Sequence, residues 1–271
     1  MSQLIFPPLV LSEWKETRDT LQKYCRMVGA IRETMSQPLP HSMHTNLLIN
    51  SKGFTTSLLP KNVPSSDQTF EVIIDLINTR LIIESSYRES LRIALTGQSL
   101  NALCDETCSE LVDIGVKPPL EKPSFLEGTR GRFDPEPLTK YWAIVTSVHR
   151  VMHKFKSELR EKISPVQVRP DDLALIVTLF GEKLNVKSPS FGKQIEFGFS
   201  TGDEVIREAY FYISTFPSTE EIKELIAKEY LIQNNGRPYR AVLPYCAVIA
   251  KENTEEMITD FFKGALVAFK K

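Results

Sequence analysis

The sequence has almost no net charge and no long apolar run. Its 271 residues hold 33 Lys and Arg against 34 Asp and Glu, which gives a formal net charge of −1 at pH 7. A charge so close to zero supplies no basic field to attract nucleic acid or an anionic membrane. No apolar stretch approaches the roughly 20 residues needed to cross a bilayer, and residues 1–8 lack the basic start of a signal peptide. We therefore expect a soluble, cytoplasmic protein with no nucleic-acid or membrane partner.

Cysteine is also scarce, with only four in the chain. Cys104 and Cys108 are four residues apart on one face of a predicted helix, so they lack the two-residue gap of a redox or zinc pair. Cys25 and Cys246 stand alone. We interpret these residues as small, mostly buried apolar side chains, in keeping with a reducing compartment.

The signatures of common enzyme classes are absent too. The chain has no P-loop, no Gly-x-Gly-x-x-Gly fingerprint and no Gly-x-Ser-x-Gly elbow. His149 and His153 have a helical spacing that can chelate a metal, and His41 and His44 precede a strand, but no pattern indicates a third ligand. We therefore expect no metal site and no cofactor, and we favour a protein that is not an enzyme without excluding catalysis.

What the sequence does contain is a repeated order of elements. A helix led by Trp14 is followed by strand-like runs and a closing helix near Leu100, and a helix led by Trp142 opens the same order, ending in a helix that reaches Phe269. The short loops between sequential strands imply antiparallel pairing. We predict an α+β fold made of two similar helix–antiparallel sheet–helix halves, whose sheets could join edge to edge into one surface.

The boundary between the halves is predicted from proline and glycine. Residues 118–132 contain three prolines and two glycines and show no apolar period, so they are interpreted as a linker. The first half is then 1–117 and the second is 133–271. A Ser218 and Glu221 capping pair predicts an extra helix near 219–232 in the second half.

Nearly the whole chain resembles an uncharacterised, mainly bacterial domain-of-unknown-function family, family 5996, as a divergent member. The stretches that carry the resemblance are LSEWKETRDTL (11–21), NLLINSKGFTTS (46–57), FEVIIDLINTRLII (70–83), FDPEPLTKYW (133–142), Ser164–Val166, REAY (207–210) and Leu243–Tyr245. The resemblance implies a shared fold and no known activity.

This chain departs from the family where typical members carry polar and aromatic groups. An Asn-His-Trp-Trp run is replaced by 40–43, and a histidine after Ser-Pro-Val is replaced by Gln167. A His-Glu pair after REAY is replaced by 212–213, and an aspartate after Leu-Pro-Tyr is replaced by Cys246. If the family has a site there, the resemblance implies that this chain has lost most of its ionisable members.

The most prominent polar cluster lies around the REAY stretch. Arg207, Glu208, Tyr210 and Tyr212 follow one another in and before a predicted strand, and the two tyrosines share a face by the two-residue period. Together with Tyr245 from a predicted strand at 241–249, they could line a pocket for a small planar ligand, with Arg207 clamping a carboxylate. The alternative is a surface ion pair beside tyrosines at the edge of the core.

Two further polar groups have structural and functional interpretations. Asp75 lies in a strongly apolar strand, and Arg80 just past the turn is its expected partner in a structural ion pair. Hydroxyls of the run 55–57 could bind a ligand, although threonine on a strand mostly serves cross-strand packing.

The sequence leaves three hypotheses for function. We favour a non-catalytic protein that binds an unknown small molecule or a protein partner. The alternative is an enzyme, a hydrolase or transferase, that uses the cluster around Arg207, Glu208 and Tyr210. A third hypothesis is self-association into a homodimer through an exposed strand edge.

Overall fold

The computed structural model describes residues 6–39, 42–61, 68–87, 90–116, 128–183, 192–216, 231–232, 240–249 and 251–269. The chain forms two compact units. The N-terminal unit consists of Ser12–Trp142 and Val168–Leu173, and the C-terminal unit consists of Met1–Leu11, Ala143–Gln167 and Ala174–Lys271. The predicted division at 118–132, with the extra helix near 219–232, stays a prediction, because most of those residues lie outside the described ranges.

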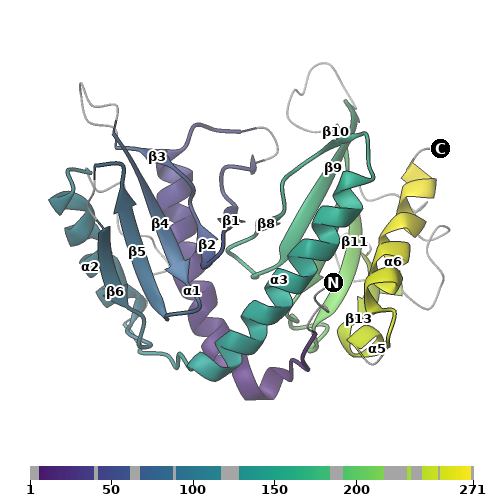
Figure 1. The fold of residues 1–271 in the computed structure, drawn as a ribbon, viewed down its shortest axis with the longest axis horizontal. Helices are drawn as coiled ribbons and strands as arrows, with labels where there is room; N and C mark the ends of the chain where they lie inside the picture. The colour runs from purple at the N-terminus through teal and green to yellow at the C-terminus, as the bar shows by residue number, and fades with distance from the viewer. Residues whose placement is uncertain are drawn as a thin grey trace. The chain divides into compact units, whose positions relative to one another are not determined.

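The N-terminal unit combines helices with antiparallel strands (Figure 1). Its elements are α1 (Leu11–Met35), β1 (Leu47–Ile49), β2 (Gly53–Thr55), β3 (Leu59–Pro60), β4 (Thr69–Asp75), β5 (Arg80–Ser85), β6 (Ser90–Ala94), α2 (Leu100–Asp113) and the first turns of α3 (Pro135–Ser157). The strands pair in the order β1-β2-β4-β5-β6, and β3 adds to β4. Each connection is short, as antiparallel pairing allows.

Apolar periodicity explains why these segments fold as they do. Helix α1 buries one stripe at helical spacing, which includes Trp14, Leu21, Tyr24, Cys25, Val28 and Ile31. In β4, Val72, Ile73 and Ile74 are all buried, so both faces of this central strand are covered. Ser99 caps α2 by accepting a hydrogen bond from the backbone N–H of Ala102.

The C-terminal unit also combines helices with antiparallel strands. Its elements are the rest of α3, β7 (Lys162–Ile163), β9 (Leu175–Lys183), β10 (Gly192–Ser200), β11 (Tyr210–Phe216), β12 (Leu231–Ile232), β13 (Arg240–Pro244), α5 (Tyr245–Ile249) and α6 (Thr254–Phe269). The strands pair in the order β12-β13-β11-β10-β9, and β7 adds to β9. Strand β8 (Gln167–Val168) lies where the chain passes between units.

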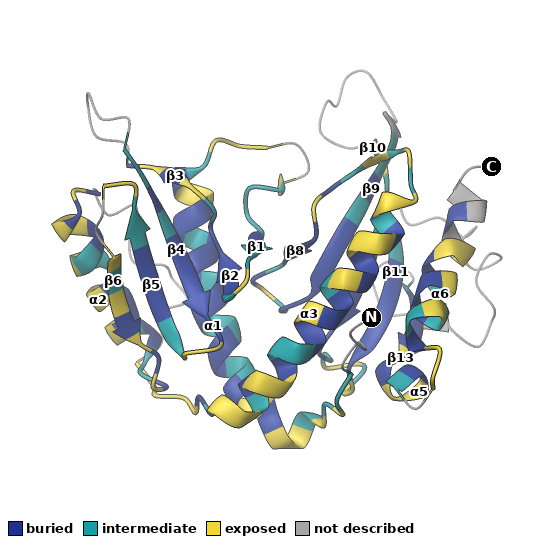
Figure 2. Cartoon of the chain, viewed as in Figure 1, coloured by how far each residue is buried: buried dark blue, intermediate teal, exposed yellow. Residues whose placement is uncertain are grey.

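Aromatic packing holds the helices of this unit on one face of its sheet. Phe155 of α3 and Phe262 of α6 both contact Phe197 of β10, with ring centroids 4.9 and 5.4 Å apart. Phe211 of β11 joins the same group through Phe262. Figure 2 shows the buried side of α6 turned toward β11 and its exposed side away from it.

The predicted α+β class is confirmed, whereas the internal duplication and the joining of the two sheets stay predictions. One predicted element bound is wrong. The strand predicted at 241–249 ends at Pro244, and helix α5 follows, because proline has no N–H to extend the ladder. Between β2 and β3 the strand pairing is interrupted near Ser57, which has a positive φ of 58°.

No helix in the described part of the chain is both long and apolar enough to cross a membrane.

The turn between β4 and β5 is built around the carboxylate of Asp75, which is completely buried. Its Oδ1 accepts hydrogen bonds from the backbone N–H groups of Ile77 and Asn78, and its Oδ2 accepts from Asn78 Nδ2 and from Arg80 Nε, 3.0 Å away. The predicted Asp75–Arg80 pair is therefore confirmed. Burial alone would raise the pKa of Asp75, but these hydrogen bonds and the charge of Arg80 outweigh it and lower the pKa.

We expect Asp75→Asn to destabilise the fold at pH 7 by about 2–3 kcal/mol, because an amide would place a donor against donors of Asn78 and Arg80. Because the folded pKa of Asp75 is lowered, its stabilisation is full above the unfolded pKa of about 3.9 and is lost as pH falls through the folded value. Urea unfolding from pH 7 down to pH 3 measures this: the gap between the variant and wild type should narrow with acid. Glu136→Gln, in an exposed pair with Lys140, is the control and should stay within about 0.5 kcal/mol throughout. A gap that does not change with pH would contradict the assigned role of the carboxylate.

Candidate functional site

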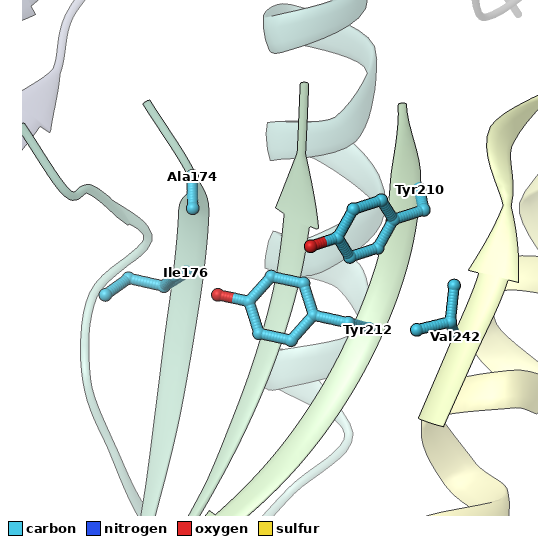
Figure 3. Close-up of a cluster of buried hydrophobic side chains, with 5 residues drawn as sticks. All are labelled: Ala174, Ile176, Tyr210, Tyr212 and Val242. Atoms are coloured by element: carbon cyan, nitrogen blue, oxygen red, sulfur yellow. The ribbon is translucent and has the colours of Figure 1, made fainter. Parts of the chain in front are cut away.

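Two tyrosines of β11 lie side by side on the face of the C-terminal sheet opposite to the aromatic helix contacts. Tyr210 and Tyr212 alternate with Phe211 along the strand, so they point to the other face. Figure 3 shows both rings lying across the sheet, with their hydroxyls directed toward the side of Ala174 and Ile176. The two ring centroids are 5.9 Å apart. Both tyrosines are buried in a cluster with Ala174, Ile176 and Val242.

A glycine opposite Tyr212 allows its ring to lie flat. Gly198 of β10 is the register partner of Tyr212 in the β10–β11 ladder. A Cβ placed on Gly198 would be 2.2 Å from Cζ of Tyr212, far inside van der Waals contact. The absent side chain at position 198 is therefore the space that the tyrosine ring fills.

The hydroxyl of Tyr210 belongs to a polar network with a carboxylate and a guanidinium. It donates to Oδ2 of Asp203 at 2.7 Å and accepts from Nη1 of Arg240 at 3.2 Å. Arg240 also lies 3.7 Å from the same carboxylate oxygen. The other oxygen, Oδ1, accepts the backbone N–H groups of Val205 and Ile206, both at 2.8 Å. Asp203 thereby fixes the loop between β10 and β11 and joins it to β11 and β13.

The second tyrosine is held at both its ring and its hydroxyl. The guanidinium of Arg240 stacks over the ring of Tyr212, with Cζ 4.8 Å from the centroid. The hydroxyl of Tyr212 donates to Oε1 of Glu196 on β10 at 2.7 Å. Arg240 thus contacts both tyrosines, one by a hydrogen bond and one by stacking.

The environment shifts the pKa values of Asp203 and Tyr210 in opposite directions. Burial raises the pKa of Tyr210 to about 12, and its hydrogen bond to the Asp203 carboxylate acts in the same direction. Burial would also raise the pKa of Asp203, but hydrogen bonds from Ile206, Tyr210 and Val205 outweigh it and lower that pKa. At neutral pH the phenol is therefore protonated and the carboxylate is charged.

The structure brings together only part of the predicted residue set. Arg207 and Glu208 are exposed in the loop before β11, and Glu208 Oε2 accepts a hydrogen bond from the Cys246 thiol at 3.7 Å. Tyr245 opens α5 on the opposite face of the sheet, where its ring contacts Phe199 and Phe211 and its hydroxyl donates to the carbonyl of Pro7. Tyr210 and Tyr212 therefore adjoin one another, whereas Tyr245 lies apart from them.

Sequence reasoning missed three residues of this network, namely Glu196, Asp203 and Arg240. The Gly202-Asp203 pair carried a local signal, because aspartate after glycine is typical of a turn in which the carboxylate binds the next N–H groups. Glu196 and Arg240 had no such signal. Their positions beside β11 depend on strand order, which local patterns do not specify.

The histidines do not assemble a metal site among the described residues. His149 and His153 are near one another on α3, with ring centroids 6.0 Å apart. Burial, followed by the charges of His153 and Lys156, lowers the pKa of His149. His44 accepts a hydrogen bond from the backbone N–H of Leu39, and His41 lies outside the described ranges. Within those ranges, no three His, Cys, Asp or Glu side chains gather in a way that could hold a metal ion.

We expect Gly198→Ala to destabilise the C-terminal unit by about 1–3 kcal/mol, because the new methyl group would displace the Tyr212 ring. Gly264→Ala is a matched control, since Gly264 lies in α6 and, apart from its own helix backbone and chain neighbours, no atom of the described residues lies within 4 Å of the added Cβ. That change should stabilise the protein by up to about 1 kcal/mol through helix propensity. Thermal or urea unfolding measures both, and equal effects at the two glycines would contradict the close approach of Tyr212.

No curated protein and no solved structure matches this chain. The chain does match the family of unknown function DUF5996 over residues 6–269, a range that covers most of both units. The resemblance noted from the sequence is thereby confirmed, and the protein belongs to the DUF5996 family.

Proposed function

We propose that this protein is a non-catalytic binding protein that holds a small planar carboxylate at the solvent-facing edge of the tyrosine cluster. The observation that carries the proposal is the stacking of Arg240 on Tyr212, with the same guanidinium braced by Asp203 and Tyr210. A guanidinium fixed in this way presents a flat, charged surface without a further loss of side-chain freedom.

Exposure supports this location for the ligand. The tyrosine rings are buried, but the side chains of Arg240 and Asp203 keep about a quarter of their surface exposed, at 25% and 26%. The polar end of the network therefore reaches solvent, while its apolar body forms the wall behind it. A planar ring suits stacking on a guanidinium, and a carboxylate complements its charge.

The electrostatics of the cluster support binding over catalysis. General acid–base catalysis is most effective when the pKa of the catalytic group lies near the working pH. Here the pKa of Asp203 is lowered and that of Tyr210 is raised to about 12, so both move away from neutrality. Each group keeps one protonation state at pH 7 and serves to position its neighbours.

We expect benzoate and nicotinate to raise the Tm of the wild-type protein, since a ligand that binds only the folded state stabilises it by about 2.7 kcal/mol at a hundredfold excess over Kd. Cyclohexanecarboxylate, which has the charge without the flat ring, should give a smaller shift. Arg240→Ala should abolish the response, and Arg207→Ala, which changes an exposed arginine outside the network, should keep it. Differential scanning fluorimetry at fixed ionic strength is the measurement.

Either of two results would contradict the proposal: no planar carboxylate raises the wild-type Tm, or the shift persists in Arg240→Ala. Tyr210→Phe tests how much the network contributes to folding stability. It removes one hydroxyl from the network, so it should lower the Tm of the unliganded protein, because a hydrogen bond to a charged group contributes about 1.5–3 kcal/mol.

An enzyme is the second candidate, favoured by the exposed group of Arg207, Glu208 and the Cys246 thiol, which donates to Glu208. A hydrolase or transferase using these residues would lose turnover in Glu208→Gln and in Arg207→Ala. A panel of ester, amide and group-transfer substrates measures this. Unchanged turnover in both variants would remove the two residues from any chemistry.

A further inference from the structure

Arg32 of α1 is buried in the N-terminal unit without a carboxylate partner among the residues that the structure describes. Only 8% of its surface is exposed. Its Nη1 donates to the carbonyl oxygen of Thr56, but its Nε has no hydrogen-bond partner within the described ranges. Buried charges in proteins are nearly always paired, because taking an ion out of water is costly. The positive charge and the unused donor both require an explanation.

One part of the guanidinium has a clear structural role. The backbone N–H of Thr56 still bonds to the carbonyl of Val72, but the chain then leaves the ladder at Ser57, where φ is 58°. This break separates β2 from β3 and leaves the carbonyl of Thr56 without a strand partner in the described ladder, so Arg32 supplies the donor. That bond accounts for Nη1 and not for Nε.

The neighbouring hydroxyls are already committed. Thr55 Oγ1 donates to Glu71 Oε1, and Thr56 Oγ1 donates to the carbonyl of Ser57 while it accepts the N–H of Val72. The sequence suggested these hydroxyls as ligand groups. Both hydroxyls have hydrogen-bond partners, whereas Nε of Arg32, which reaches the same segment from α1, has none within the described ranges.

We propose that the Nε edge of Arg32 binds a small oxyanion, the phosphoryl or carboxylate group of a ligand. A guanidinium presents two parallel N–H groups along this edge, and they match two oxygens of a carboxylate or phosphate. The anion neutralises the buried charge and satisfies Nε together. Burial lowers the pKa of Arg32.

This site is separate from the tyrosine cluster. Arg32 and Thr56 belong to the N-terminal unit, whereas Tyr210, Tyr212 and Arg240 belong to the C-terminal unit. The inference therefore goes beyond the proposed function and does not depend on it. The two proposals are tested by different variants, Arg240→Ala and Arg32→Met, so the failure of one leaves the other standing.

The test compares Tm in sodium phosphate, sodium acetate and sodium chloride at equal ionic strength and pH. We expect phosphate or acetate at about 10 mM, roughly the Kd of a weak anion site, to raise the wild-type Tm above its value in chloride. Arg32→Met should abolish that difference. Arg32→Lys should reduce it at least threefold, because lysine keeps the charge but lacks the two parallel donors.

Arg26→Met is the matched control, because Arg26 lies on the same helix in a partly exposed pair with Asp171. Its anion response should equal that of wild type. If Arg32→Met does not fold, Arg32→Lys and a calorimetric titration of the wild type with phosphate and acetate decide the question. The proposal is overturned if neither anion exceeds chloride in the wild type, or if the anion response survives unchanged in the Arg32 variant that folds.

Discussion

The carboxylate of Asp203 is the fixed point on which the arrangement of the tyrosine cluster depends. Its two oxygens accept hydrogen bonds from the backbone of the β10–β11 loop and from the Tyr210 hydroxyl, and Oδ2 forms an ion pair with Arg240. A charged acceptor with this many donors is strongly stabilised in its ionised form, and each donor loses its freedom in return. The position of Arg240, and through it the stacking on Tyr212, follows from this one group.

Some positions at which this chain departs from its family lie near this network. The resemblance implies a histidine and a glutamate where this chain has Tyr212 and Ile213, and an aspartate where it has Cys246. In this structure Tyr212 and Ile213 necessarily face opposite sides of β11. Cys246 lies in α5, where it contacts Glu208. Tyr212 and Ile213 therefore belong to different faces of β11, and Tyr212 is part of the network of Asp203 and Arg240.

Local patterns predicted much of the fold because short-range physics determines it. The stripe of α1 and the hairpin of β4 and β5 both follow from apolar periods of 3.6 and 2 residues. The same reasoning predicted that Tyr210 and Tyr212 share a face. It failed at Tyr245, because apolar residues after Pro244 fit a strand as well as a buried helical turn. It also missed Arg240, because the pairing of β11 with β13 joins residues about 30 positions apart and has no local signature.

The flat placement of Tyr212 on Gly198 has an evolutionary consequence. Neither position can change in size without altering the space available to the other, since the ring occupies the volume that a side chain at 198 would need. Selection then acts on the pair: relatives that lose the glycine should carry a smaller residue opposite it. Correlated substitution at these two positions would then be explained by this one steric contact.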